Sequence, residues 1–268
     1  MSETSLTIRL GTEELLTAMH LLRIKSLPGM GENPVPALDD PHGALILSAG
    51  LNSLRAREWV KSPQNEGDPV IIDSTVMALL VTCTNAPLAL LINRVPLAAA
   101  PQSTYLHFGA QLTVMHTIPE PGVHAFSATV SQAEAADWAA GALNLGEQPA
   151  PATPAFQMTE KTFETFTEAL RNNQNEELYA MLGQAGLSRP EAEAAVTFMR
   201  EMQANSMVAA VRLDPANPEA AGAGFSLIES QGGFWKLRAL VQDPDLMIAV
   251  EPAAAADCRA ELETLMKA

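Results

Sequence analysis

The chain has 268 residues, of which 47% are hydrophobic, and this is enough for one large domain or two modest ones with buried cores. Its 31 acidic residues outnumber its 16 basic residues, so the formal net charge is -15 at pH 7. Because nucleic-acid affinity rests on clustered Lys and Arg, this charge argues against DNA, RNA and anionic membrane surfaces as partners.

The amino-terminal residues 1–8 contain no basic segment followed by an apolar stretch, so they do not resemble a secretory signal and predict a cytoplasmic protein. The longest apolar tract, residues 76–100, is interrupted by Asn85, Pro87, Asn93 and Arg94. These residues are costly at the centre of a bilayer and fit a helix followed by a strand. The sequence therefore predicts no membrane span.

The first half of the chain predicts three helices, four strands and a closing helix. Gly11 precedes apolar residues at helical spacing, and Pro28 with Gly29 ends this first helix. Asp73 is the predicted N-cap of the third helix. The second and third helices are expected at 41–61 and 73–83, the strands at 88–93, 104–108, 111–118 and 123–130, and the closing helix at 133–143.

Residues 147–155, Glu-Gln-Pro-Ala-Pro-Ala-Thr-Pro-Ala, are typical of a semi-rigid linker that spaces two halves without a fixed contact. They separate an N-terminal α+β repeat, 1–146, from a C-terminal α+β repeat, 156–268. In the second half, helices are expected at 160–172, 175–186, 189–203 and 253–266, and strands at 207–213, 224–229, 234–240 and 246–250.

Both halves show the same order of elements, and residues 86–136 match residues 206–256 at an offset of 120. Val130 falls on Val250, and aromatic Tyr105 falls on aromatic Phe225. Short consecutive strands with turn-length connections favour antiparallel pairing. The predicted fold class is α+β, with two duplicated ααα-ββββ-α subdomains whose antiparallel sheets are related by a pseudo-two-fold axis.

Three histidines on successive predicted strands raise the question of a metal or catalytic site. If residues 109–110 form a hairpin loop, His107 and His116 share a face but lie about 13 Å apart. If residues 119–122 form the next turn, His124 opposes Thr117 and points to the other face. We therefore expect exposed or singly hydrogen-bonded imidazoles and no metal site.

No Gly-x-Ser-x-Gly elbow, Walker-type phosphate loop, His-Glu-x-x-His or Cys-x-x-Cys motif is present. Carboxylate pairs such as Glu13 with Glu14 fall mostly in the first turns of predicted helices, where they complement the helix dipole. Cys83 and Cys258 are expected to be buried thiols. The sequence thus predicts a binding scaffold without catalytic residues, metal or cofactor.

A cluster of Met and aromatic residues in the second half is the candidate binding site. Met side chains adapt to irregular partners, so those near residues 198–207 fit a docking surface for a helix, although a core stripe is the alternative. Phe234 and Trp235 are adjacent on a strand and must face opposite sides, so we expect one to be exposed. The candidate binding residues are Phe198, Met202, Met207, Phe234 and Trp235.

Four short segments resemble the EspG family of cytosolic chaperones associated with type VII secretion. They are Leu54-Arg-Ala-Arg57, Gly224-Phe-Ser-Leu-Ile, Phe234-Trp-Lys-Leu and Ile248-Ala-Val-Glu-Pro252. The chain departs from the family at Arg57-Glu58-Trp59, where the family has Arg-Gly-Leu, and at Gln231-Gly232-Gly233, where it has Gly-Arg.

The EspG resemblance implies a non-enzymatic binder that holds the hydrophobic helical tip of a secretion substrate. It also implies binding through the sheet, a strand-connecting loop and the helices of the second half. Two alternatives stay open: an immunity or assembly-type binding module whose acidic face engages a basic partner, and an enzyme with an unrecognised carboxylate or histidine site.

Overall fold

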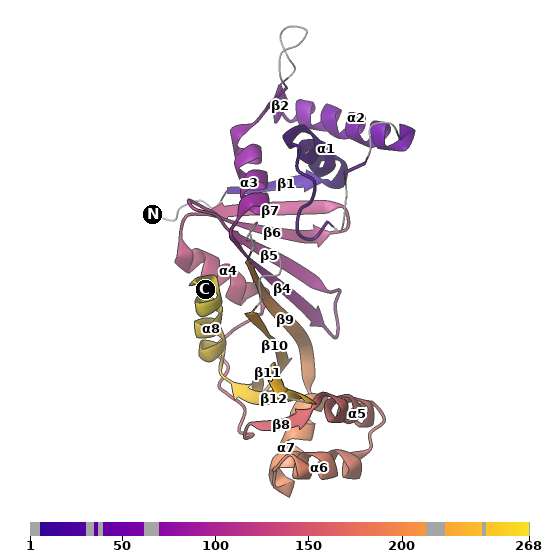
Figure 1. Ribbon diagram of the computed structural model, residues 1–268, viewed down its shortest axis with the longest axis vertical. Helices are drawn as coiled ribbons and strands as arrows, with labels where there is room; N and C mark the ends of the chain where they lie inside the picture. The colour runs from indigo at the N-terminus through magenta and orange to yellow at the C-terminus, as the bar shows by residue number, and fades with distance from the viewer. Residues whose placement is uncertain are drawn as a thin grey trace. The chain divides into compact units, whose positions relative to one another are not determined.

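The computed structural model describes residues 6–30, 35–36, 40–61, 70–212, 223–242 and 245–267 (Figure 1). These residues form two compact units. The first comprises the described residues within Met1–Leu91, Gln102–Ala139 and Val211–Ala221, and the second those within Ile92–Pro101, Ala140–Ala210 and Gly222–Ala268. The chain passes between the units within two of its strands and within one of its helices, so neither unit is a single continuous segment.

The first unit contains an antiparallel sheet with helices packed against it. Its elements are β1 (Leu6–Gly11), α1 (Thr12–Leu22), α2 (Pro41–Ala56), β2 (Val60–Lys61), β3 (Ile71–Ile72), α3 (Ser74–Asn85), the start of β4 (Leu88–Pro96), β5 (Gln102–Phe108), β6 (Thr113–Glu120), β7 (Val123–Thr129) and most of α4 (Gln132–Ala142). Its strand order is β1-β7-β6-β5-β4. The pairs β1–β7, β7–β6 and β6–β5 are antiparallel.

The second unit also contains an antiparallel sheet with helices packed against it. Its elements are the end of β4, β8 (Phe156–Thr159), α5 (Glu160–Arg171), α6 (Asn175–Gln184), α7 (Arg189–Arg200), β9 (Met202–Arg212), β10 (Ala223–Ser230), β11 (Gly233–Gln242), β12 (Asp245–Ala253) and α8 (Ala255–Lys267). Strands β9 to β12 form an antiparallel meander, and β8 pairs antiparallel with β12.

The α+β class and the antiparallel strand pairing are therefore confirmed. Each unit also contains a first strand that the sequence did not predict. Strand β1 pairs with β7, with Leu10 opposite His124, and β8 pairs with β12, with Met158 opposite Ile248. Both strands are short and end directly before a helix, and their partners lie far along the chain, so local periodicity does not reveal them.

Local sequence signals place the helix starts as expected. Asp73 accepts hydrogen bonds from the backbone N–H groups of Thr75 and Val76 at the start of α3. Ser188 and Glu191 form a capping box at the start of α7. Such caps satisfy N–H groups that have no partner inside the helix. Within the described parts of the chain, no helix is both long and apolar enough to cross a membrane.

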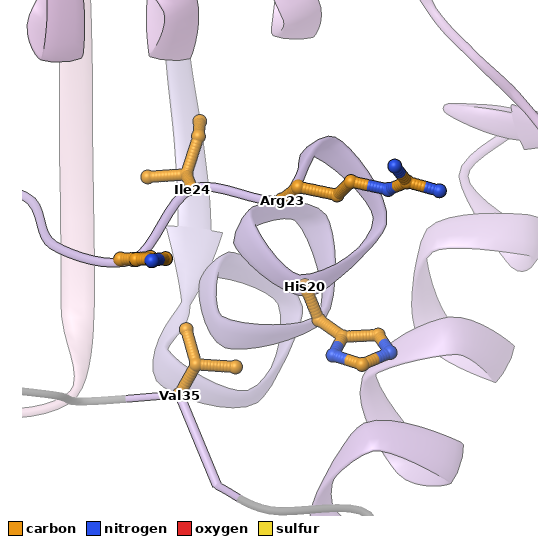
Figure 2. Close-up of a pocket in the computed structure, with 5 residues that line it drawn as sticks. His20, Arg23, Ile24 and Val35 are labelled. Carbon is orange, nitrogen blue, oxygen red and sulfur yellow. The ribbon is translucent and has the colours of Figure 1, made fainter.

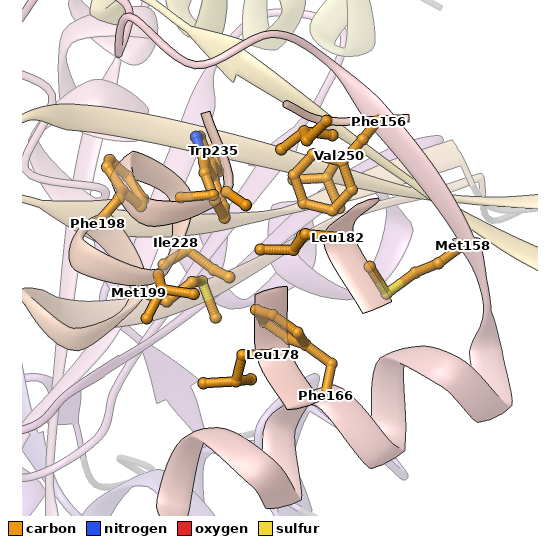
Figure 3. Packing of buried hydrophobic residues seen from close by; sticks show 14 of the residues in the cluster. Phe156, Met158, Phe166, Leu178, Leu182, Phe198, Met199, Ile228, Trp235 and Val250 are labelled. Atoms are coloured by element: carbon orange, nitrogen blue, oxygen red, sulfur yellow. The ribbon is translucent and has the colours of Figure 1, made fainter. Parts of the chain in front are cut away.

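The core of the second unit lies between its three-helix group, α5 to α7, and one face of its sheet (Figure 3). Phe166, Leu182 and Phe198 approach from the helices, and Trp235 and Val250 approach from the sheet. The ring of Phe198 stacks on that of Trp235 with centroids 4.5 Å apart. This packing fixes the helices on one end of the sheet face.

The Pro/Ala segment 147–155 is irregular, as the sequence indicates, but it is not free of contacts. Thr153 is buried and accepts a hydrogen bond from the indole N–H of Trp235. The carbonyl of Gln148 accepts one from the N–H of Ala255. The expectation of a spacer without a fixed contact is therefore wrong, because these side-chain and backbone groups find partners within the second unit.

Candidate functional site

Three of the five candidate binding residues lie in the protein interior. Phe198 is buried, and Phe234 and Trp235 are each only 1% exposed. The expectation that either Phe234 or Trp235 is exposed is therefore wrong. These three side chains stabilise the second unit and are not available to a partner.

Both aromatic residues are buried because each face of β11 is covered by a helix. On the Trp235 face, α7 supplies Phe198. On the other face, Lys236 and Arg238 alternate with Trp235 along the strand and both bond to Glu261 of α8. Phe234 shares this second face, since strand side chains alternate. The alternation of the two side chains was predicted correctly from the sequence, but local periodicity could not show that helices cover both faces of the strand.

The two methionines differ in exposure. Met202 was expected on a helix, but α7 ends at Arg200 and Met202 is the first residue of β9. It is half-buried and packs against the second core. Met207, five residues further along β9, has 46% of its surface exposed. Met207 is therefore the one predicted site residue that a partner can reach directly.

Met207 belongs to an apolar part of the sheet face that α5 to α7 leave uncovered. Exposure increases steadily along β11 on this face, from Trp235 at 1%, through half-buried Leu237 and exposed Ala239, to Val241 at 88%. The helices thus cover the beginning of the strand and not its end. We call the exposed group Met207, Gly224, Ala239 and Val241 the open sheet surface.

The strand register places these residues on the same face. Met207 of β9 is opposite Ser226 of β10, and Ser226 is opposite Leu237 of β11. Ala239 and Val241 follow Leu237 at two-residue intervals, so their side chains point the same way. The sequence did not identify Ala239 or Val241, since the run Leu237 to Val241 carries no signal for where helix coverage stops. The connection between β9 and β10 lies outside the described residues.

The three-helix group of the second unit carries many charged side chains on its exposed surface. Arg189 of α7 bonds to Glu176 of α6 and to Glu193 on its own helix. Hydrogen bonds from Arg189 hold the pKa of Glu176 below its usual value. Glu164 and Glu168 of α5 are exposed on the same helix face. The helical part of the second unit therefore presents a predominantly acidic surface to solvent.

The three histidines lie together, contrary to the expectation that His124 faces away. His116 Nε2 and His124 Nδ1 are 3.0 Å apart. The β6–β7 turn is tighter than predicted, with Glu120 opposite Val123, and the register shifts between Thr117 and Glu120. A bulge of this kind inserts an extra residue and changes which face the following side chains occupy. The histidines were also expected to be exposed or singly hydrogen-bonded. All three are buried, and His116 and His124 share one hydrogen bond, whereas His107 has no hydrogen-bond partner among the described residues.

This histidine cluster lacks the chemistry of an acid–base site. Burial lowers the pKa of His107 to about 4. Burial is the main cause that lowers the pKa of His116 to about 3, and the neighbouring His124 and His107 lower it further. The backbone of Pro28 acts in the opposite direction and raises this pKa. Among the described residues, no group of three or more His, Cys, Asp or Glu side chains is arranged to hold a metal ion.

Neither cysteine is a reactive thiol. Cys83 and Cys258 are free and buried, as predicted. Burial raises the pKa of Cys83, and burial raises the pKa of Cys258 to about 11. Because the thiolate is the form that acts as nucleophile and metal ligand, both thiols are unreactive at neutral pH.

A shallow pocket in the first unit is lined by His20, Arg23, Ile24, Lys25 and Val35 (Figure 2). Its basic residues lie at and just beyond the last turn of α1, where Arg23 adopts a left-handed conformation and caps the helix. The carboxyl end of a helix carries a partial negative charge, which basic side chains offset and which disfavours an anionic ligand. The basic residues of this pocket are therefore explained by the carboxyl end of α1, whose partial negative charge they offset.

No known family model matches the chain, and no curated protein sequence matches it. Its fold, however, is similar to that of a solved structure. The chain is similar to the Mycobacterium tuberculosis type VII secretion system chaperone EspG5, whose structure was solved in complex with a PE25-PPE41 dimer. The match has a TM-score of 0.68 and 15% sequence identity, and it covers 97% of this chain and 96% of that chain. The distant resemblance to the EspG family is confirmed at the level of the fold.

Proposed function

We propose that this protein is a non-enzymatic, cytoplasmic chaperone of the EspG type that holds a helical type VII secretion substrate. The observation that carries the proposal is the open sheet surface on a fold shared with EspG5 along nearly its full length. EspG5 itself is a chaperone seen with a PE-PPE dimer. A PE-PPE-like helical pair is therefore the substrate class we propose for this chain.

The chemistry of the surface supports a helical substrate. Val241 and Met207 are large apolar side chains exposed to water, and Gly224 and Ala239 between their strands add little bulk. An amphipathic helix can lay its apolar face on such a shallow surface, and Met adapts to irregular partners. Covering these side chains removes apolar surface from water on both partners, which favours association. The acidic surroundings keep the free chaperone soluble.

The residues that could have carried chemistry support a binder over an enzyme. His107 and His116 are completely buried, and neither bonds to a carboxylate in the described parts of the chain. The alternative of an enzyme with a carboxylate/histidine site required a polar cleft shared by one of these histidines and an acid. Since the rings are enclosed among apolar side chains, they do not support that alternative.

We also propose that the chain arose by tandem duplication, with repeats at 1–146 and 156–268 about a pseudo-two-fold axis. Apart from the short β2–β3 pair between α2 and α3, both units run strand, three helices, four strands and helix. In both, the first strand pairs with the last one, as β1 does with β7 and β8 with β12. Such a shared, non-local strand order supports a common origin of the two halves.

An assembly or immunity module that engages a basic protein is the second candidate function. Exposed Glu164, Glu168 and Glu201 and the net charge of -15 favour it. Salt screens the attraction between exposed charges at the edge of an interface, so a complex held by such charges weakens at high salt. A complex held by buried apolar surface remains stable. The salt dependence of complex formation therefore separates the two candidates.

Co-expression with a PE-PPE-like helical pair, followed by size-exclusion chromatography at low and high salt, tests the proposal. We expect a complex that survives high salt and that Met207→Glu or Val241→Glu weakens at least tenfold. Val130→Glu is the matched control, because Val130 is 75% exposed but lies outside the open sheet surface. No complex with such pairs, or equal loss in the control, contradicts the proposal, and a complex that dissociates in salt favours the second candidate.

A further inference from the structure

All five histidines of the chain lie in the first unit. They are His20, His42, His107, His116 and His124, and the second unit contains none. Histidine is the side chain whose ordinary pKa lies within the range of mildly acidic to neutral pH. A modest fall in pH can therefore act on one unit and leave the other unchanged.

Three of these histidines form a closed cluster on one face of the first sheet. His107 and His116 have no exposed surface, and His124 is 4% exposed. The ring of His116 stacks between those of Phe126 and Tyr105, with centroids 4.6 and 5.5 Å away. Both ring nitrogens of His107 lack a hydrogen-bond partner. The cluster is thus packed among aromatic rings and is shielded from bulk solvent.

The elements around the cluster supply no opposite charge among the described residues. Strand β1 contributes Ile8 and Leu10 to this face, because they are opposite Phe126 and His124. Helix α3 has no charged residue, and its titratable Cys83 is buried with a raised pKa. On this face, the titratable side chains of β5 are Tyr105 and His107, and those of β6 and β7 are His116 and His124.

The segment after α1 and the helix itself complete these surroundings. The Pro28 backbone is the group that favours a proton on His116. A Cβ at Gly29 would lie 2.7 Å from the Tyr105 ring, so this segment packs closely over the cluster. Basic Arg23 and Lys25 in the same segment disfavour a further positive charge. On α1, Glu13 and His20 are not buried, and Glu14 is held by Gly11, Ser53 and Arg57.

We propose that the cluster of His107, His116 and His124 is an acid-sensitive element: below about pH 6.5, protonation opens the β5–β7 part of the first unit while the second unit keeps its structure. The folded cluster accommodates neutral rings, and an opened one accommodates charged rings in water. Acid therefore shifts the equilibrium toward the open form. This device is independent of the substrate that the protein holds.

The sign follows from the direction of the pKa shifts. Burial lowers the pKa of His107 to about 4 and that of His116 to about 3, and burial also lowers the pKa of His124. Stability is therefore complete above the ordinary histidine value of about 6.5 and is lost as the pH falls below it. Each of these histidines changes the opening equilibrium by up to about tenfold per pH unit in that window.

Hydrogen exchange followed by mass spectrometry on the full chain tests this proposal, at about pH 7.5 and about pH 5.5 with rates corrected for the intrinsic effect of pH. We expect peptides from β5, β6 and β7 to lose protection at the lower pH and peptides from β10 to β12 to retain it. Equal loss in both units, or no change in the first, overturns the proposal.

The variant His107→Leu sharpens the test, because both nitrogens of His107 lack partners and the substitution sacrifices no hydrogen bond. We expect the opening equilibrium of the first unit to depend less steeply on pH in this variant, by up to about tenfold per pH unit. His42→Leu is the control, since His42 is exposed on α2, and it must leave the pH dependence unchanged. An unchanged pH dependence in His107→Leu contradicts the proposal.

A measurement on the unmodified protein covers the case in which His107→Leu does not fold. Nitrogen-15 NMR of labelled histidine distinguishes neutral from protonated rings. We expect the rings of His107 and His116 to stay neutral in folded protein at about pH 5.5, although the ordinary histidine pKa is about 6.5. Titration of all five rings near that value in folded protein overturns the proposal.

Discussion

Trp235 donates its indole N–H to Thr153 Oγ1 across 3.0 Å, and this bond ties the segment before β8 to the beginning of β11. Both partners are buried. The Pro/Ala segment is therefore part of the second core and not a free spacer. Trp235 thereby combines a large buried apolar surface with a satisfied polar group, as buried tryptophans usually do.

Thr153→Ala tests this bond. The substitution leaves the indole N–H buried without a partner, so we expect unfolding of the second unit to require about 1–3 kcal/mol less free energy. Urea denaturation monitored by tryptophan fluorescence measures the change. Thr165→Ala is the control, because Thr165 is exposed on α5 and bonds only to the carbonyl of Lys161. Equal stability of the two variants contradicts the prediction.

Arg94 and Glu229 form a buried ion pair within the second unit, with Nη2 and Oε2 2.7 Å apart. Asn144 donates to the other carboxylate oxygen. Arg94 is the one charged residue among Lys, Arg, Asp and Glu between Asp73 and Glu120. We expect Arg94→Met to cost about 3–5 kcal/mol, since it leaves the Glu229 charge buried without its partner.

The double variant Arg94→Met with Glu229→Gln is the matched control for the ion pair. The glutamine carbonyl can still accept from Asn144, and no charge remains buried. We expect chemical denaturation to show that it recovers most of the lost stability, because removing both charges avoids the desolvation cost. A double variant as unstable as Arg94→Met would show that packing, not charge, dominates at this site.

Glu58 adopts a left-handed conformation, with φ at 59°, at the position where the EspG family has glycine. It directly follows the end of α2, where the N–H groups of Glu58 and Trp59 bond to the carbonyls of Arg55 and Leu54. Glycine adopts this conformation without steric cost. We expect Glu58→Gly to raise the thermal unfolding midpoint, with a gain of about 0.5–1 kcal/mol.

Asn173→Gly is the control for this glycine effect. Asn173 also has a positive φ, at 56°, but asparagine tolerates the left-handed region better than glutamate. The gain from Asn173→Gly should therefore be smaller than that from Glu58→Gly. A destabilised Glu58→Gly protein would contradict the assignment of conformational strain to Glu58.

Glu14 accepts hydrogen bonds from the N–H of Gly11, from Ser53 and from Arg57. Burial alone raises the pKa of Glu14, but these bonds and the charge of Arg57 outweigh burial and lower it from 4.5. Glu14→Gln should cost about 1–3 kcal/mol at neutral pH because the charge-assisted bonds are lost.

The pH dependence of stability shows whether the charge of Glu14, and not only the shape of its side chain, contributes to stability. A lowered pKa stabilises the folded state above the ordinary value and loses this effect as the pH falls through the folded value. The stability difference between the natural protein and Glu14→Gln should therefore be constant above about pH 5.5 and shrink below about pH 4.5. Urea denaturation at several pH values measures it, and a difference that does not shrink contradicts the role of the charge.

Local sequence signals predicted the features that depend on near neighbours along the chain. The cap at Asp73 and the capping box of Ser188 and Glu191 mark helix starts, because a short polar side chain satisfies N–H groups two or three residues away. Cys83 was predicted to be buried from the small and apolar residues of its own helix. Apart from the short strands β1, β2, β3 and β8, the order of helices and strands, and hence the α+β class, followed from signals of this kind.

Tertiary structure decided which side chains remain accessible. A bulge between Thr117 and Glu120 turned His124 toward His116, and two helices on opposite faces of β11 buried both Phe234 and Trp235. The exposed end of the same strand at Val241 became the candidate binding surface because α5 to α7 stop short of it. Periodicity specifies the direction of a side chain, whereas coverage depends on residues far away in the sequence, which is why only the folded chain reveals the surface.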